Sequence, residues 1–233
     1  MLIFFNKNKV NDYADLINYI VSVITPMLVD VRENKEHHPT GNTLAHTISA
    51  YRLVEREDIN VIIATLLHDI GKSLTPPELQ PKHHGHEKKG ISLIEDIEIK
   101  VKERFPDKKY SVIDWDFVKN VSKYHMYRNE LLRTKHLAKK LLRLVISFHS
   151  QEEKLLDYWK VVLADMQSEG YRRMIPVKLY DIIGKSYAIC KYYNSKEFDV
   201  EIEEMMREKK INIDKELLFW NCEVDLIRKM LLS

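Results

Sequence analysis

The sequence predicts an all-α protein, and three of its features indicate this. Glycine and proline are scarce, with 6 and 7 residues among 233. Long stretches of Leu, Lys, Glu and Ile repeat at helical spacing, and no segment alternates apolar and polar residues as a strand does. With 45% hydrophobic residues the chain can bury one sizeable core. We therefore expect one helical domain over residues 1–195 and a helical extension, packed on it, over residues 196–233.

Apolar residues that recur three or four positions apart predict eight helices in the first 195 residues. Proline, glycine and polar clusters, such as the segment 73–85 and the stretch FPDKKYSVID, separate them and are predicted to be loops. The expected helical ranges are 11–30, 42–56, 59–70, 86–104, 114–127, 134–149, 152–168 and 176–193.

The last part of the chain changes in composition after Tyr193. An acidic and then basic stretch precedes an amphipathic segment whose apolar side chains step along one helix face. Core packing of this stripe is the favoured interpretation, and homodimerisation through it is the alternative. The stripe consists of Leu217, Trp220, Val224, Ile227 and Leu231.

Several classes of protein are disfavoured by the composition. No apolar run approaches the roughly 18 residues of a membrane span, and the start MLIFFNKNKV lacks a secretory signal, so we expect a cytoplasmic protein without a membrane partner. Cys190 and Cys222 are too few for a disulfide framework and are predicted to be reduced packing residues.

The net charge of +2 is too small to attract nucleic acid by its overall field. One local cluster of cations could follow an RNA backbone, although a solvated helix face is the commoner reason for such a pattern. The cluster comprises Arg133, Lys135, Lys139, Lys140 and Arg143.

The segment VIIATLLHDIGK carries the strongest functional signal. An apolar run from Val61 to Leu67 places His68 and Asp69 at the end of a buried helix, and Gly71 is expected to let the chain turn out. Burying an imidazole beside a carboxylate is costly unless a partner satisfies both, and a bound cation does so.

Further candidate ligands lie on the apolar faces of other predicted helices. A histidine bonded to a backbone carbonyl in the core is the ordinary alternative for each one alone, but their joint occurrence favours a metal site. The other six histidines show no comparable inward position. The expected faces are His46 with Ala50 and Leu53, His86 with Gly90, Leu93 and Ile97, His125 with Trp115, Val118 and Ser122, and Asp165 with Leu155, Tyr158 and Val162.

The order of these residues, from His46 through the His68–Asp69 pair to His86, His125 and Asp165, resembles the HD superfamily of metal-dependent phosphohydrolases. The run HDIGKSLTPPELQPKHHGH closely resembles the HD domain of bacterial multifunctional CCA-adding proteins. The segment GNTLAHTI and the pair Ala164–Asp165 are similar to flanking motifs of that family. The resemblance covers roughly residues 40–190 and implies an HD-domain helical bundle with an additional C-terminal helical segment.

Two departures from the CCA-adding proteins limit this resemblance. Only about forty residues precede His46, where those proteins carry a nucleotidyltransferase head, so CCA addition is not implied. The EKKG that follows His86 is similar to the pattern of two-metal HD phosphodiesterases, which leaves one or two ions open.

The resemblance implies hydrolysis of nucleotide phosphoesters by water activated on a divalent ion. Asp69 and Asp165 with His46 and His68 would hold an ion, while His86 and His125 would bind a second ion or contact phosphate. This set of nitrogen and oxygen ligands accepts Ni, Mn, Co, Mg, Fe or Zn. We expect 2′,3′-cyclic nucleotide phosphodiesterase, nucleotidase or phosphatase activity. The alternatives are a two-metal phosphodiesterase for a cyclic or oligonucleotide signal, and a non-catalytic module that binds tRNA, an RNA end or another partner.

Lysine and histidine residues beside the ligands are predicted to contact the substrate. Lys72 follows the HD pair by one short turn and would neutralise charge on the phosphoryl oxygens, whereas an exposed lysine is the plain alternative. Lys82, His83 and His84, near the end of the proline-stiffened segment 73–85, would form the substrate-facing edge, or else belong to a rigid connector.

Overall fold

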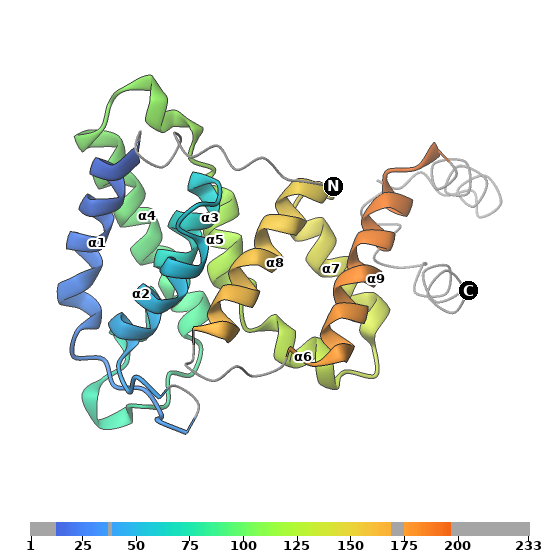
Figure 1. Cartoon of the computed structure of the whole chain (residues 1–233), viewed down its shortest axis with the longest axis horizontal. Coiled ribbons are helices and arrows are strands. Elements are labelled where there is room, and N and C mark those ends of the chain that lie inside the picture. The colour runs from blue at the N-terminus through green and yellow to red at the C-terminus, as the bar shows by residue number, and fades with distance from the viewer. Residues whose placement is uncertain (1–12, 37–38, 169–174, 197–233) are drawn as a thin grey trace. The chain divides into compact units, whose positions relative to one another are not determined.

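The protein is described by a computed structural model that covers residues 13–36, 39–168 and 175–196. These residues form α-helices joined by short 3-10 turns, with no strand among them beyond an isolated bridge between Arg32 and Asn42. Figure 1 shows the helices in chain order. The expectation of an all-α fold is confirmed.

The described residues divide into two compact units, each considered by itself. The first runs to Met126 and resumes at Asp157, and the second comprises Tyr127–Leu156 and the described residues from Pro176 onward. The boundary falls within α8 (Glu152–Gln167). The predicted extension, with its apolar stripe and Cys222, lies outside the described residues, and the expected boundary at residue 196 stays a prediction.

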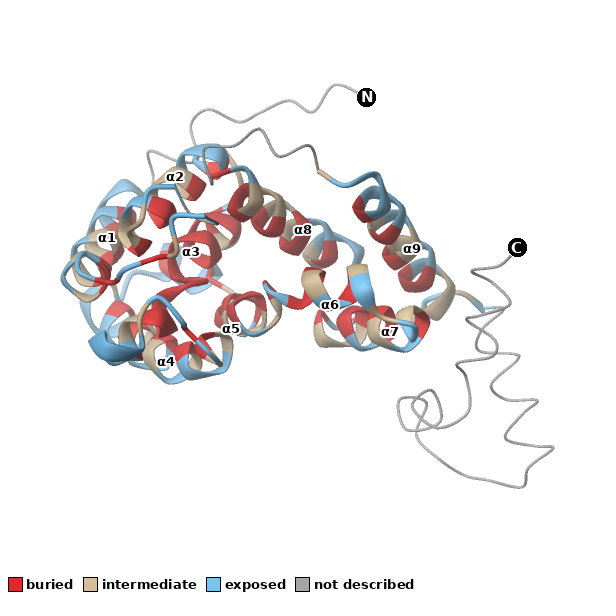
Figure 2. Ribbon diagram, turned by 90° about the horizontal axis from the view of Figure 1, so that it is seen from below, coloured by how far each residue is buried: buried red, intermediate tan, exposed pale blue. Residues whose placement is uncertain are grey.

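Helix α3 (Ile59–Leu67) is the centre of the first unit. Eight of its nine residues are buried, so it cannot present a polar face to water. It packs against the other helices of the unit, as Figure 2 shows by the buried (red) colour along its length. Those helices are α1 (Ala14–Leu28), α2 (Thr43–Val54) and α5 (Trp115–Tyr124), with α4 (His86–Arg104) packed on α5.

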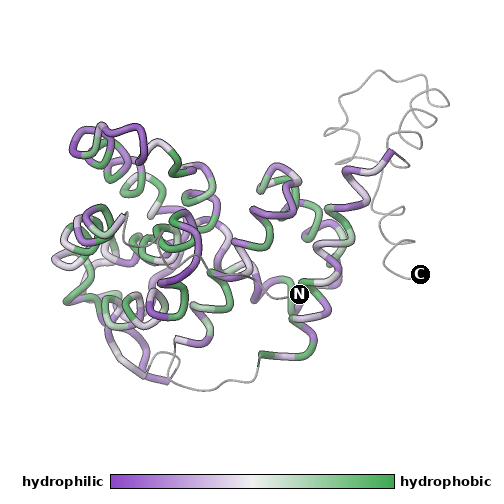
Figure 3. Tube along the Cα trace, turned by 45° about the horizontal axis from the view of Figure 1, so that its top comes forward, coloured by the Kyte–Doolittle hydropathy of each residue, from purple (hydrophilic) through white to green (hydrophobic). Residues whose placement is uncertain are grey.

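The surrounding helices are amphipathic, and hydrophilic and hydrophobic residues alternate along their traces in Figure 3. Polar side chains mark where they begin: Asn42, Asp58 and Asp114 each accept a hydrogen bond from a backbone N–H in the first turn of α2, α3 and α5. These caps explain why the predicted starts of these three helices agree with the observed ones to within one residue, whereas α7, predicted from residue 134, begins at Leu137 without a side-chain cap.

The second unit contains α6 (Tyr127–Arg133), α7 (Leu137–Ser147) and α9 (Val177–Tyr193), which contact one another. Cys190 is buried there as a free thiol whose Sγ lies 3.2 Å from the carbonyl oxygen of Ser150. Burial raises the pKa of this thiol to about 11, so it is a packing residue, as predicted.

Several helix boundaries differ from the prediction. The helix expected over 114–127 ends at Tyr124, and a separate helix, α6, begins at Tyr127. The helix expected over 59–70 ends at Leu67, after which residues Ile70–Leu74 form a 3-10 turn, η2. Each of these two helices ends where a histidine points into the interior. The inward position of the histidine therefore ends the helix earlier than the apolar pattern of the sequence predicts. The segments predicted as loops contain the 3-10 turns η3 (Pro77–Leu79) and η4 (Lys108–Val112).

Gly71 is needed for close packing rather than for an unusual backbone turn. A Cβ atom at this position would lie 2.1 Å from the carbonyl oxygen of His86 and 2.6 Å from the backbone nitrogen of Gly90. The turn after the HD pair therefore touches the first turn of α4 backbone to backbone. This contact fixes where His86 lies.

Within the described part of the chain, no helix combines the length and the apolar character that crossing a membrane requires.

We expect Gly71→Ala to destabilise the protein by about 3 kcal/mol or more, because the methyl group overlaps backbone atoms that cannot rotate away. The measurement is chemical denaturation followed by circular dichroism. Gly184→Ala is the control: nothing lies within 4 Å of its added Cβ, and alanine favours the helix by about 0.5–1 kcal/mol. Equal stability of the two variants would contradict the backbone contact.

Candidate metal centre

The six predicted ligands converge on one buried site in the first unit. They come from α2, α8, the start of α4 and the ends of α3 and α5, and each is at most 6% exposed. The sequence therefore predicted correctly that these side chains point inward. The six residues, called the ligand cluster below, are His46, His68, Asp69, His86, His125 and Asp165.

One half of the ligand cluster surrounds Oδ2 of Asp69. The Nε2 atoms of His46 and His68 lie 3.4 Å and 3.2 Å from this oxygen. They also lie 3.0 Å and 3.7 Å from Oδ1 of Asp165. Both imidazoles thus lie between the two carboxylates.

The other half surrounds Oδ1, the second oxygen of Asp69. The Nε2 atoms of His86 and His125 lie 3.1 Å and 3.3 Å from it and 3.1 Å from each other. The carboxylate of Asp69 therefore stands between two groups of potential ligands and presents one oxygen to each. His46, His68 and Asp69 form one such group, and Asp69, His86 and His125 form the other.

These separations fit divalent ions. With metal–ligand bonds of about 2.1 Å, neighbouring ligand atoms lie about 3.0–3.4 Å apart in octahedral or tetrahedral geometry. Most of the distances above fall in this interval. In addition, Nε2 of His68 and Oδ1 of Asp69 are buried without a hydrogen-bond partner, which is costly unless a cation satisfies them. The residues present therefore fit a metal centre.

The other ring nitrogen of each histidine is anchored. Nδ1 of His68 lies 2.7 Å from the carbonyl oxygen of Thr65. His86 and His125 make the same contact with the residue three positions earlier, at 2.7 Å and 2.6 Å. Nδ1 of His46 lies 3.1 Å from Oγ of Ser168. Because a carbonyl accepts only from a protonated Nδ1, Nε2 of these rings is left to face the site.

Charges inside the cluster tune its protonation. Burial alone would lower the pKa of His68, but Asp69 and Asp165 outweigh it and raise the pKa to about 10. Burial dominates at His125 and lowers its pKa to about 4, so this ring is neutral at pH 7. The pKa of Asp69 is well below its usual range, because the charges of His68 and Lys72 outweigh the effect of burial.

Lys72 lies against the cluster. Its ammonium is 2.8 Å from Oδ2 of Asp69 and 2.8 Å from Oε1 of Glu33, and it is 5% exposed. Burial lowers the pKa of Lys72, but these two carboxylates outweigh it and raise the pKa above its ordinary value. The plain alternative of an exposed lysine is wrong, and the predicted role at a phosphoryl group stays a prediction.

The predicted substrate-facing edge is only partly at the surface. Lys82 and His84 are exposed, whereas His83 is buried and its Nε2 lies 2.8 Å from the carbonyl oxygen of Arg32. His83 thus ties its segment to the chain before α2, although no inward position was predicted for it. Leu53, expected beside His46, is 51% exposed, and the inward positions of α2 are instead occupied by Thr43, Thr47, Ala50 and Val54.

Two residues that support the cluster were not predicted. Ser168 lies three residues after Asp165, a helical spacing that could have indicated a shared face, and its Oγ also donates to the carbonyl oxygen of Asp165 at 2.7 Å. Glu33 lies in a turn without periodicity, where no sequence signal relates it to Lys72.

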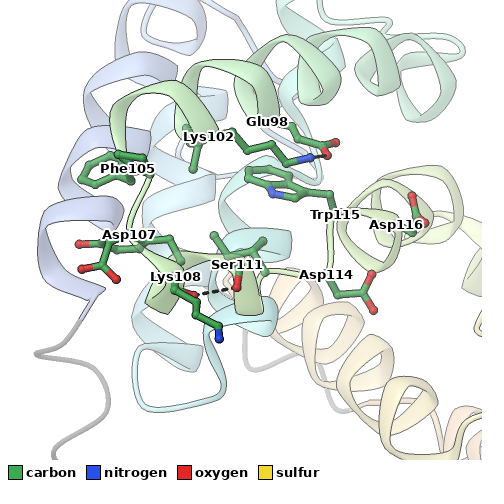
Figure 4. A pocket seen from close by; sticks show the side chains of 13 residues that line it. Glu98, Lys102, Phe105, Asp107, Lys108, Ser111, Asp114, Trp115 and Asp116 are labelled. Atoms are coloured by element: carbon green, nitrogen blue, oxygen red, sulfur yellow. Dashed lines mark hydrogen bonds and ion pairs between the residues drawn. The ribbon is translucent and has the colours of Figure 1, made fainter.

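A pocket of the first unit lies away from the ligand cluster. It has a volume of about 650 Å³ and is formed by the C-terminal end of α4, the turn η4 and the first residues of α5. Phe105 and Trp115 line it together with charged side chains such as Glu98 and Lys102 (Figure 4). The ligands on α4 and α5 lie at the opposite ends of these helices, so this pocket is not the metal site.

We expect binding of a divalent ion to release about one proton per chain at pH 7.5, because His68 carries a proton below its pKa of about 10 and must lose it to become a ligand. Calorimetric titrations of metal-free protein in buffers of different ionisation enthalpy measure this number. The apparent affinity should rise as the pH is raised toward 10. Proton uptake on binding would contradict the assignment.

Ser168→Ala should weaken metal binding by about 10- to 100-fold, because it removes the partner that orients His46. Competition with a chromophoric chelator measures the affinity. Ser111→Ala is the control, since that exposed hydroxyl donates only to the carbonyl oxygen of Lys108, within η4. Equal affinities of the two variants would show that Ser168 does not support the site.

Comparison with known proteins gives results that agree with this site. A family model described as the HD domain matches residues 35–162, more than half of the chain. A multifunctional CCA protein of Halorhodospira halophila is 25% identical over 173 residues, which are 73% of this chain and 40% of that protein. One of Pseudomonas fluorescens is 34% identical over 123 residues, which are 52% and 28% of the two chains.

The chain therefore matches well under half the length of these curated relatives. No solved structure matches it significantly. The HD domain implies a metal-dependent phosphohydrolase, and the His/Asp ligand cluster fits the metal that such an activity needs. On the evidence of the family match, the protein belongs to the HD domain family.

Proposed function

We propose that the protein is a phosphodiesterase that uses two divalent ions, one on each side of Asp69, to hydrolyse nucleotide phosphoesters. The observation that carries this proposal is that the two oxygens of the Asp69 carboxylate face different histidines. Oδ2 faces His46 and His68, and Oδ1 faces His86 and His125. Ligand groups on both oxygens of one carboxylate suit a carboxylate that bridges two ions, and this supports two ions over one.

Ions bound here would supply a water molecule of lowered pKa and would neutralise charge on the phosphoryl group. The chain's own residues provide the frame. The side on Oδ2 has two carboxylates and two imidazoles, whereas the side on Oδ1 has one carboxylate oxygen and two imidazoles. The second side therefore has fewer protein ligands and is where a phosphoester oxygen is expected to bind. Lys72 adds a fixed positive charge beside Asp69.

The preferred substrates are nucleotide diesters. The resemblance of residues 68–86 to the HD domain of CCA-adding proteins favours 2′,3′-cyclic nucleotides, while the paired arrangement on Asp69 favours a cyclic or oligonucleotide signal. Nucleotidase or phosphatase activity with one ion is the second candidate, favoured by the same resemblance. A non-catalytic module that binds tRNA is the third, and it requires that the metal serves only stability.

An RNA end as the substrate or partner has one observation in its favour. In the second unit, Arg133, Lys135, Lys139 and Arg143 are exposed, while Lys140 is half-buried and paired with Glu130. Within α7, Lys139, Lys140 and Arg143 lie opposite a buried face and form one polar face, whereas Arg133 and Lys135 precede this helix. Homodimerisation remains a separate proposal, since the apolar stripe that suggested it lies outside the described residues.

Removing one ligand from the side on Oδ1 should separate the proposals. We expect His125→Ala to retain one ion instead of two, because the ligands on Oδ2 remain, and to lower turnover of 2′,3′-cyclic AMP at least about 100-fold. Metal content after dialysis and hydrolysis rates with single added ions are the measurements. His136→Ala, which changes an exposed histidine of the second unit with no predicted role at the site, is the control and should keep both ions and full turnover.

Asp69→Ala tests the whole centre, because it removes an oxygen from each side. Loss of metal and of turnover in a folded variant supports the hydrolase. One ion in the unaltered protein, with turnover of phosphomonoesters, would support the second candidate instead. Full metal binding without turnover of any diester or monoester, in protein whose stability depends on the metal, would support the binding module.

A further inference from the structure

A buried ionic triad borders the ligand cluster. Lys72 lies between Asp69 and Glu33, with its ammonium 2.8 Å from an oxygen of each, and Glu33 is only 7% exposed. Oε1 of Glu33 also accepts a hydrogen bond from the hydroxyl of Thr43 at 2.7 Å. A buried pair of this kind is kept only when its charges are matched, because removing one partner leaves the other desolvated and uncompensated.

Glu33 is fixed in place by the chain around it. Its backbone N–H donates to the carbonyl oxygen of Gly41 at 3.1 Å, next to the bridge between Arg32 and Asn42. The carbonyl oxygen of Arg32 is in turn held by His83 at 2.8 Å. The segment that precedes α2 and the segment that leads into α4 therefore both contact the backbone at Arg32 and Glu33, which positions Glu33 beside Lys72. Glu33 lies outside the residues matched by the family model, which begin at 35.

The position of Lys72 creates a conflict at the proposed centre. Its ammonium contacts Oδ2 of Asp69, the same oxygen that faces His46 and His68. An ion bound on that side would share this oxygen with a fixed positive charge at close range. Repulsion in a buried site of low dielectric is strong, and it would weaken that ion unless a negative charge offsets the ammonium.

We infer that Glu33 is a positioning residue that allows a metal ion to bind on the Oδ2 side of Asp69. Its carboxylate attracts the ammonium of Lys72 and offsets its positive charge. Oδ2 of Asp69 can then contact a metal ion and Lys72 at the same time. This inference rests on the proposed two-ion function. It also predicts that the two ion sites respond differently to Glu33. Lys72 contacts Oδ2, whereas His86 and His125 face Oδ1. Glu33 therefore governs the affinity for one ion more than for the other.

The test uses Glu33→Gln, which removes the charge but keeps an oxygen that can accept from Thr43. Manganese titrations of metal-free full-length protein, followed by calorimetry and electron paramagnetic resonance, resolve the two binding events. We expect one of the two affinities to fall by about tenfold or more and the other to stay within about twofold. The paramagnetic resonance signal of two coupled manganese ions should weaken together with the lower affinity. Glu98→Gln is the matched control, since that glutamate pairs with Lys102 and Lys119 at the far end of α4.

A second variant separates this electrostatic role from simple destabilisation. In the Glu33→Gln/Lys72→Met double variant both charges are gone, so the weakened affinity should return toward that of the unaltered protein. A Glu33→Gln variant that keeps both affinities, or a double variant that stays as weak as the single one, overturns the inference. If the unaltered protein binds fewer than two ions even at saturating manganese, the proposed two-ion function is overturned instead.

Discussion

The carboxylate of Asp69 is the interaction on which the rest of the site depends. Asp69 lies just after the largely buried helix α3 and contacts four imidazoles and one ammonium, and its two oxygens contact different sets of these groups. A buried carboxylate in such surroundings stays ionised only because positive charge or metal is close, and its depressed pKa reflects this. Helix α2, the start of α4 and the end of α5 each bring a histidine to this one side chain, while α8 brings Asp165 to His46 and His68.

Three of the histidines lie at helix ends and are oriented by the same kind of hydrogen bond. His68 and His125 follow the last residues of α3 and α5 with nearly identical backbone angles, and His86 begins α4. Each ring bonds the carbonyl oxygen three residues earlier through Nδ1. Placing ligands at helix ends lets the ring reach back to a carbonyl and still project Nε2 into the site.

The two interpretations of these histidines are compatible. A core histidine bonded to a backbone carbonyl describes the Nδ1 side of each ring, and a metal ligand describes the Nε2 side. The first contact supplies the orientation that the second requires, because an imidazole held by a carbonyl has one tautomer and one direction. The triad of Asp69, Lys72 and Glu33 applies the same logic to charge, since the lysine is useful beside a cation only while a second carboxylate balances it.

The sequence by itself determined the helical class, most helix ranges and the inward positions of the six candidate ligands. These follow from short-range chemistry: apolar spacing places a side chain on an inward face, and capping residues such as Asn42 mark where a helix starts. The sequence did not predict the separate helix α6, the early ends of α3 and α5, or the exposure of Leu53. These features depend on the space that neighbouring helices leave.

Only the tertiary structure decided which oxygen of Asp69 each histidine faces, that Ser168 supports His46, and that Glu33 reaches Lys72 across 39 positions. Such contacts join residues whose spacing carries no periodic signal. Their distances come from the packing of whole helices and from one backbone contact at Gly71, which no local pattern records.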